Sequence, residues 1–189
     1  GQISAYAASG DTGQSTTIST NGWLQFGSDT DWVDIVCWSQ FPQKTLAIKG
    51  TGSSKYLYGC GSNSQGGLPV GTNSGSTKPF TRAKSASSTD LAEDFNAGGL
   101  DQGYNNGMAV ASNGKLYVWG EGSSGVLGTG NTTDNYYAAQ MGTDTDWSLP
   151  FVYSGRNAGL CIKTNGTLYM STSTTSSLNI QPASANRTY

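Results

Sequence analysis

The carboxylates of this chain fall into short patterns that could support catalysis or metal binding. Residues 11–13 read Asp-Thr-Gly, as in aspartic proteases, but that chemistry needs two carboxylates sharing a proton, and the tripeptide does not occur again. Asp29 and Asp31 are spaced two residues apart, as are Asp144 and Asp146. Such pairs either coordinate calcium or hydrogen-bond to the backbone of a turn. We favour the turn, because a calcium loop needs more oxygen ligands, and calcium is the alternative.

Other catalytic groups are missing or isolated in the sequence. The chain contains no histidine, which removes the commonest general base and a frequent zinc ligand. Cys37, Cys60 and Cys161 form an odd and widely spaced set, so we expect three small buried side chains, with one disulfide plus a free thiol as the alternative. No glycine-rich loop ends in the Lys-Ser or Lys-Thr of a phosphate site. We therefore expect no catalytic residue, cofactor or metal, and a protein that is not an enzyme.

The composition indicates turn-rich β-structure. Glycine contributes 27 of 189 residues, and charged residues make up only 12%, so the long polar helix faces of an α-protein are hard to build. The formal net charge is −2 and no basic run occurs, which argues against a nucleic-acid partner. No apolar stretch reaches the roughly 18 residues of a membrane span, so we expect no membrane insertion.

The chain also repeats itself. Residues 27–32 read GSDTDW and residues 142–147 read GTDTDW. A weaker copy, STDLAEDF, lies between them at 88–95, and its Leu91 takes the position of the tryptophan in our alignment. An apolar strand, a turn and a Leu-Tyr strand follow each copy, which predicts a β-hairpin in every repeat.

The turns and the glycine-rich segments define the rest of each unit. Asn-Gly at 113–114 and at 165–166 predicts two-residue hairpin turns with positive φ at both positions. A longer turn, GTGSS at 50–54, serves the first copy. Glycine-rich segments at 61–79 and 120–135 close the first two units, and the third unit lacks one. Each unit is too small to bury its own apolar face, so the units must pack on one another.

These boundaries give a domain organisation of two full units and one partial unit between two arms. The ranges are 1–26 for an N-terminal arm, 27–86, 87–141 and 142–170 for the units of one β-repeat domain (27–170), and 171–189 for a Ser/Thr-rich C-terminal arm.

Two segments resemble the repeat of the regulator of chromosome condensation family. Residues 114–130, GKLYVWGEGSSGVLGTG, are a close match to that repeat. Residues 57–71, LYGCGSNSQGGLPVG, match it more weakly, with Cys60 in the position of Trp119. The resemblance extends over the repeat domain, where Trp32 and Trp147 fit the upstream tryptophan of the family repeat.

The resemblance implies an all-β fold of propeller-like blades. A closed propeller needs at least about four blades, and this chain supplies two full units and a partial one. Exposed strand edges would remain, so we expect either an open structure or one completed by oligomerisation. The nucleotide-exchange and chromatin roles of the founding member depend on a full ring, specific loops and basic patches, and they do not transfer to this chain.

The low charge, the many small polar residues and the absence of histidine are similar to those of family relatives in bacteriophage virions and on bacterial surfaces. We expect a structural virion or extracellular protein, a capsid decoration or a fibre or tail component, whose partners are copies of itself and a capsid or tail protein. The alternative is a carbohydrate- or receptor-binding module that recognises a cell-surface glycan.

Four aromatic residues fall outside the repeat pattern and are candidates for a subunit interface or a ligand surface: Trp23, Trp38, Tyr136 and Tyr137. The tryptophans at repeat positions are expected in the core, because large aromatic rings dominate the burial of apolar surface.

Overall fold

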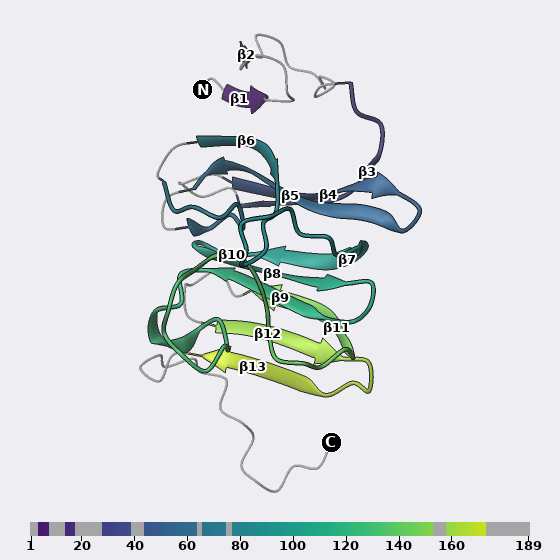
Figure 1. Cartoon of the computed structure of the whole chain (residues 1–189), viewed down its shortest axis with the longest axis vertical. Helices are drawn as coiled ribbons and strands as arrows, with labels where there is room; N and C mark the ends of the chain where they lie inside the picture. Colours follow the sequence, from purple (N-terminus) through teal and green to yellow (C-terminus); the bar gives the residue numbers. More distant parts are fainter. Residues whose placement is uncertain are drawn as a thin grey trace, which may run out of the picture.

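Three antiparallel sheets stack face to face along the long axis of the molecule (Figure 1). The computed structural model describes residues 4–7, 14–17, 28–38, 44–63, 66–74, 77–152 and 158–172. Over these ranges the structure is built of β-strands and a short 3-10 turn, Ser123–Gly125, and contains no helix long and apolar enough to cross a membrane. The expected all-β fold of propeller-like blades is confirmed.

Each sheet is a meander in which strands adjacent in sequence are hydrogen-bonded to each other. The first sheet contains β3 (Trp32–Trp38), β4 (Lys44–Thr51), β5 (Ser54–Ser62) and β6 (Thr77–Arg82). The second contains β7 (Phe95–Gln102), β8 (Asn106–Ala111), β9 (Leu116–Gly120) and β10 (Asn135–Gln140). The third contains β11 (Trp147–Val152), β12 (Ala158–Lys163) and β13 (Leu168–Thr172).

The first two sheets lie within the units expected at 27–86 and 87–141, and the third sheet extends two residues past the unit expected at 142–170. The expected N-terminal arm holds a separate hairpin, β1 (Ser4–Ala7) and β2 (Gln14–Thr17), and the first two residues of the expected C-terminal arm complete β13. The remainder of that arm, and Trp23, lie outside the described residues.

The hairpin turns differ from the expectation. In the second unit the Ala111 amide donates to the Lys115 carbonyl (2.9 Å), which leaves a three-residue loop with positive φ at Gly114 (78°) and not at Asn113. The third unit repeats this geometry. A type I turn followed by a left-handed glycine fits the twist of the strands as well as a two-residue turn does. In the first unit Thr51 pairs directly with Ser54, so the turn expected to be longest is the shortest.

The tryptophan position of the second unit also differs from the expectation. We call the first strand of each sheet (β3, β7 and β11) its inner strand. The carbonyl of the aspartate before each inner strand accepts a hydrogen bond from a backbone amide in the hairpin of its own unit: Gly50 to Asp31 (2.9 Å), Ser112 to Asp94 (2.8 Å) and Thr164 to Asp146 (2.8 Å). The residue that follows each aspartate begins the inner strand and is Trp32, Phe95 or Trp147. Phe95, and not Leu91, therefore occupies the tryptophan position, and it is fully buried.

The core consists of two layers, one on each face of the second sheet. Every side chain of β8 and β9 is buried, because residues of alternating direction meet the first sheet on one face and the third sheet on the other. Ala109 and Trp119 pack toward the first sheet, whereas Met108 and Val118 pack toward the third. The second unit is thus stabilised from both sides, and the other two units from one.

Candidate functional site: the end faces of the stack

The paired aspartates at the repeat positions each bind a lysine. In the first unit Lys49 Nζ lies 2.8 Å from Asp29 Oδ2 and 3.9 Å from Asp31 Oδ1. The same ammonium lies 5.4 Å from the centroid of the Trp32 ring, within range of a cation–π interaction. The hydrogen bond to Asp29 raises the pKa of Lys49 despite partial burial.

The third unit builds the same cluster with shorter distances. Lys163 Nζ lies 2.6 Å from Asp144 and 2.8 Å from Asp146, and 4.9 Å from the Trp147 ring. Hydrogen bonds to both aspartates raise its pKa. We call this arrangement, together with its counterpart in the first unit, the aspartate–lysine clamp.

The second unit lacks the first aspartate and the lysine of the clamp and keeps only the second aspartate, Asp94. Counting from its inner strand, Ala92 stands where the other units have the first aspartate, and Ala111 stands where they have the lysine. The sequence signal for the lysine was available: it follows the first aspartate by 20 residues in one unit and by 19 in the other.

The calcium alternative meets a physical obstacle in this geometry. An ammonium group already occupies the space between the carboxylates of Asp144 and Asp146, and a cation at that point would have to displace it. Over the described part of the chain no three metal-binding side chains are close enough to form a site. Calcium binding stays a prediction that only a binding measurement tests.

Three of the four off-repeat aromatics lie at the seam between the first and second sheets. Trp38 packs edge-on against Tyr104, with ring centroids 6.5 Å apart. The ring of Tyr136 lies against Gly66, and the Tyr136 carbonyl accepts a hydrogen bond of 2.5 Å from the Gly71 amide.

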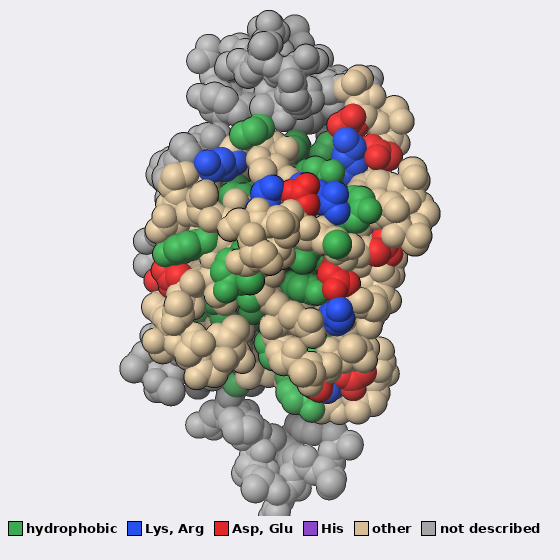
Figure 2. Space-filling model, viewed as in Figure 1, with side chains coloured by type: hydrophobic (Ala, Val, Ile, Leu, Met, Phe, Trp, Pro, Cys, Tyr) green, Lys and Arg blue, Asp and Glu red, His purple; other side chains and the backbone are tan. Residues whose placement is uncertain are grey.

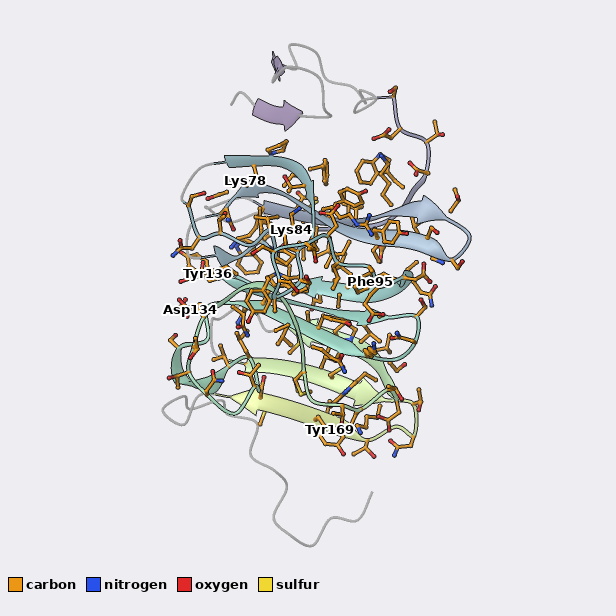
Figure 3. The ribbon with its side chains drawn as sticks, in the orientation of Figure 1. Lys78, Lys84, Phe95, Asp134, Tyr136 and Tyr169 are labelled. Atoms are coloured by element: carbon orange, nitrogen blue, oxygen red, sulfur yellow. The ribbon has the colours of Figure 1, made fainter. Side chains whose placement is uncertain are left out.

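Tyr137 pairs with Val70 in an isolated β-bridge, so β10 fastens the glycine-rich segment of the first unit onto the second. Figure 3 shows Tyr136 at this level of the stack. Trp38, Tyr136 and Tyr137 are half-buried, so these residues contact other parts of the same chain. Their contact with a second subunit or a ligand stays a prediction.

The same seam contains a buried lysine that sequence analysis missed. Lys44 is 2% exposed and donates a hydrogen bond to the Tyr104 carbonyl. Burial lowers the pKa of its ammonium to about 8. Gly67 lies directly beside the ammonium, where a larger residue would collide with it. Nothing in the local sequence of Lys44 distinguishes it from an exposed lysine.

The cysteines are all free thiols. Cys161 is buried, Cys60 is half-buried and Cys37 is exposed, so the expectation of three buried side chains is wrong for Cys37. Burial raises the pKa of Cys60 to about 12 and that of Cys161 to about 11, which keeps both thiols protonated and poor nucleophiles.

Exposed large apolar side chains lie on the two end sheets. On the third sheet, the exposed apolar residues lie mainly on the face that points away from the stack. Leu168 pairs with Ile162 as Leu116 pairs with Val110 one unit earlier. Leu168 is 58% exposed, whereas Leu116 is 1% exposed. The same repeat position is therefore covered by a neighbouring sheet in the second unit and uncovered in the third.

The outward face of the first sheet, at the other end of the stack, is exposed in the same way. Ile35 pairs with Ala47, and its counterpart Leu100 pairs with Ala109 in the second unit. Ile35 is 60% exposed, but Leu100 is 6% exposed because the first sheet covers it. The outward side of the first sheet is thus also a repeat face without its neighbour.

All the exposed large apolar side chains identified in the described ranges belong to the end sheets: Val33 and Ile35 on β3, and Leu149, Ile162, Leu168, Tyr169 and Met170 on the third sheet. We call the outward sides of the first and third sheets the first end face and the third end face. Tyr169, labelled on the third sheet in Figure 3, is the exception: it pairs with the buried Cys161 and its ring lies 5.1 Å from that of Trp147, so it faces the second sheet. On the side of the molecule in Figure 2 the charges lie in small mixed groups and not in a patch of one sign.

The comparisons with known proteins bear on the fold. No family model and no curated protein matches the sequence. Human WBSCR16, which has regulator of chromosome condensation-like repeats, superposes with a TM-score of 0.54 and 14% identity over 77% of this chain and 34% of that one. The chain has the fold of regulator of chromosome condensation-like propeller blades.

A second solved structure, Prp20p of Saccharomyces cerevisiae, which binds Gsp1p and histones, gives a TM-score of 0.46 and 16% identity over 88% of this chain and 36% of that one. The chain spans about a third of the length of both solved structures.

Proposed function

We propose that this chain is a structural, non-enzymatic virion protein, a capsid decoration or a fibre or tail component of a bacteriophage, that acts by docking through its end faces. The observation that carries the proposal is the concentration of exposed large apolar side chains on the two end sheets. Exposed apolar patches of this kind mark interaction sites in soluble proteins.

The ionisable groups support a non-enzymatic role because they hold the framework together. Glu93 binds Lys115 (2.8 Å) and the Tyr117 hydroxyl (2.7 Å). Burial opposes the ionisation of Glu93, but these hydrogen bonds outweigh it and lower its pKa. Burial and the bond to Glu93 raise the pKa of Tyr117. An acid and a base that stabilise each other in this way are poorly placed to exchange protons with a substrate.

The virion assignment rests on composition. A surface rich in small polar residues, with 12% charged residues in the chain, suits a protein exposed outside cells, and the virion or extracellular location is part of the proposal. A docking protein of a particle also needs a capsid or tail protein as a second partner.

Quantitative mass spectrometry of particles purified from the source that encodes the chain tests the proposal. We expect the chain at a fixed copy number relative to the major shell or tail protein. Absence from such particles would contradict the virion role.

A carbohydrate-binding module is the second candidate, and one cluster favours it. Trp32 lies 4.8 Å from Phe80 and 6.4 Å from Tyr58, measured between ring centroids, with the Lys49 and Asp29 pair beside them. Aromatic faces next to charged groups suit a sugar ring. A glycan array separates the candidates: saturable binding to one sugar class that Trp32→Ala abolishes supports the module, and no binding supports the structural role.

A further inference from the structure

We propose that the partner of the third end face is the first end face of a second copy of this chain, so that copies dock head to tail. The inference rests on the proposed function, since it names the partner of the same surfaces. The contact would continue the packing between sheets that the chain already contains twice, between its first and second sheets and between its second and third.

The first end face is built like a surface that already packs in this way. Within the chain, the third sheet presents Trp147 and the Lys163 clamp to the second sheet, and Trp147 is 5% exposed there against Leu116 and Val118. The first sheet presents the matching Trp32 on its outward side. Trp32 has the same strand position and the same clamp as Trp147, but it is only half-buried.

The third end face offers the matching apolar surface. Leu168 and Met170 hold the repeat positions of Leu116 and Val118, as their cross-strand partners show. Met170 is 43% exposed, whereas Val118 is fully buried. Trp32 of a second copy would therefore cover Leu168 and Met170 as Trp147 covers their counterparts within the chain.

The hairpin turns extend this register. The Trp147 amide donates to the Gly114 carbonyl in the hairpin turn of the preceding unit, at 3.1 Å. The third unit has the same turn at Gly166, with φ of 84° against 78° at Gly114. In the proposed contact the Trp32 amide of one copy would donate to the Gly166 carbonyl of the other.

A second copy is favoured as the partner because this chain carries both halves of the contact. Trp32 and its clamp lie on the first end face, and the exposed Leu168 and Met170 lie on the third. The formal net charge of −2 is also too small to oppose self-association strongly.

The N-terminal hairpin lies at the same end of the stack as the first end face. Figure 1 shows it beyond the first sheet, and its strand β1 touches β6. Because β6 and β3 are opposite edges of the first sheet, the proposed contact is on the β3 side, where Val33 and Ile35 are exposed. A head-to-tail contact over β3 and β4 is heterologous, so it closes into a ring if the rotation allows and otherwise grows as a filament.

Two charge substitutions test the proposal through complementation. Ile35→Asp breaks only the first end face and Leu168→Asp only the third, and both side chains are already more than half exposed, so the fold tolerates them. Light scattering after size exclusion measures the mass. We expect an oligomer for the wild-type chain and for the control Thr132→Asp, an exposed loop position, and monomers for both variants alone.

An equimolar mixture of the two variants should form a dimer, because the intact third end face of one meets the intact first end face of the other. A monomeric wild-type chain overturns the proposal. So does a dimer of Ile35→Asp alone, which indicates that two third end faces pack on each other. If the chain is a monomer but is present in particles, self-docking is refuted and the structural function stands. If it is a head-to-tail oligomer but is absent from particles, self-docking stands and the virion function is refuted.

Discussion

Leucine-to-alanine substitutions at one repeat position should have very different costs in the three units. Leu57, Leu116 and Leu168 occupy equivalent positions, opposite Ile48, Val110 and Ile162 in the preceding strand of each sheet. The first two are 1% exposed and belong to the two core layers, whereas Leu168 is 58% exposed. Because the substitution is identical in each case, a difference in the loss of unfolding free energy reports only whether a neighbouring sheet covers the side chain.

The expected magnitudes follow from burial. Replacing a fully buried leucine by alanine costs about 2–5 kcal/mol, because transfer energy is lost and a cavity remains. Leu168 buries less than half of its surface, so its removal should cost about 1 kcal/mol or less and leave no cavity. Urea denaturation followed by tryptophan fluorescence, in dilute solution where copies are separate, measures the free energy of unfolding.

Equal losses at Leu116 and Leu168 would refute the packing described here, because they would mean that the third end face is covered within a single chain. A further measurement at high protein concentration separates the two contributions. The cost of Leu168→Ala should then rise, since docking of a second copy buries the same side chain.

Three further perturbations test other parts of the structure. The wild-type protein should gain about 3 kcal/mol of stability relative to Lys44→Met as the pH rises from 8 to 10.5. The buried lysine has a pKa lowered from 10.5 to about 8, so the folded chain releases its proton at a lower pH than the unfolded chain does. A difference in the free energy of unfolding that stays constant with pH, measured by urea denaturation, would contradict this. Asp144→Ala and Lys163→Ala should each lower the melting temperature, and the double variant should lose less than the sum, whereas additivity would mean that the clamp is not a unit. Gly166→Ala should cost about 1–2 kcal/mol for its positive φ, and Gly114→Ala more, because a Cβ there also meets the Thr145 backbone; equal costs in urea would refute that close approach.

The repeat pattern was sufficient to predict the architecture. Glycines and Leu-Tyr pairs at fixed offsets identified the hairpins, and the small size of each unit required the units to stack. The tryptophan positions were also predictable in the first and third units, because Trp32 and Trp147 follow nearly identical hexapeptides. In the second unit the predicted position was wrong, because Leu91 lies four residues before the actual counterpart, Phe95, and both side chains are apolar and buried.

Features that depend on contacts between units were not predictable. The burial of Lys44 and the seam position of Tyr136 follow from the way one glycine-rich segment meets the next sheet. The exposure of Leu168 has the same origin, because its sequence context matches that of the buried Leu116. Local patterns encode the strand and its faces, but the neighbour that covers a face is set by the stacking order.

Hydrogen exchange at two protein concentrations tests the central claim most directly, because it shows which surfaces gain a neighbour. Docking through the end faces predicts slower exchange at high concentration in β3 and in β11–β13, with no change in β8 and β9, which are already covered on both sides. Exchange that does not depend on concentration, or protection confined to β10 and the glycine-rich segments, would contradict the claim.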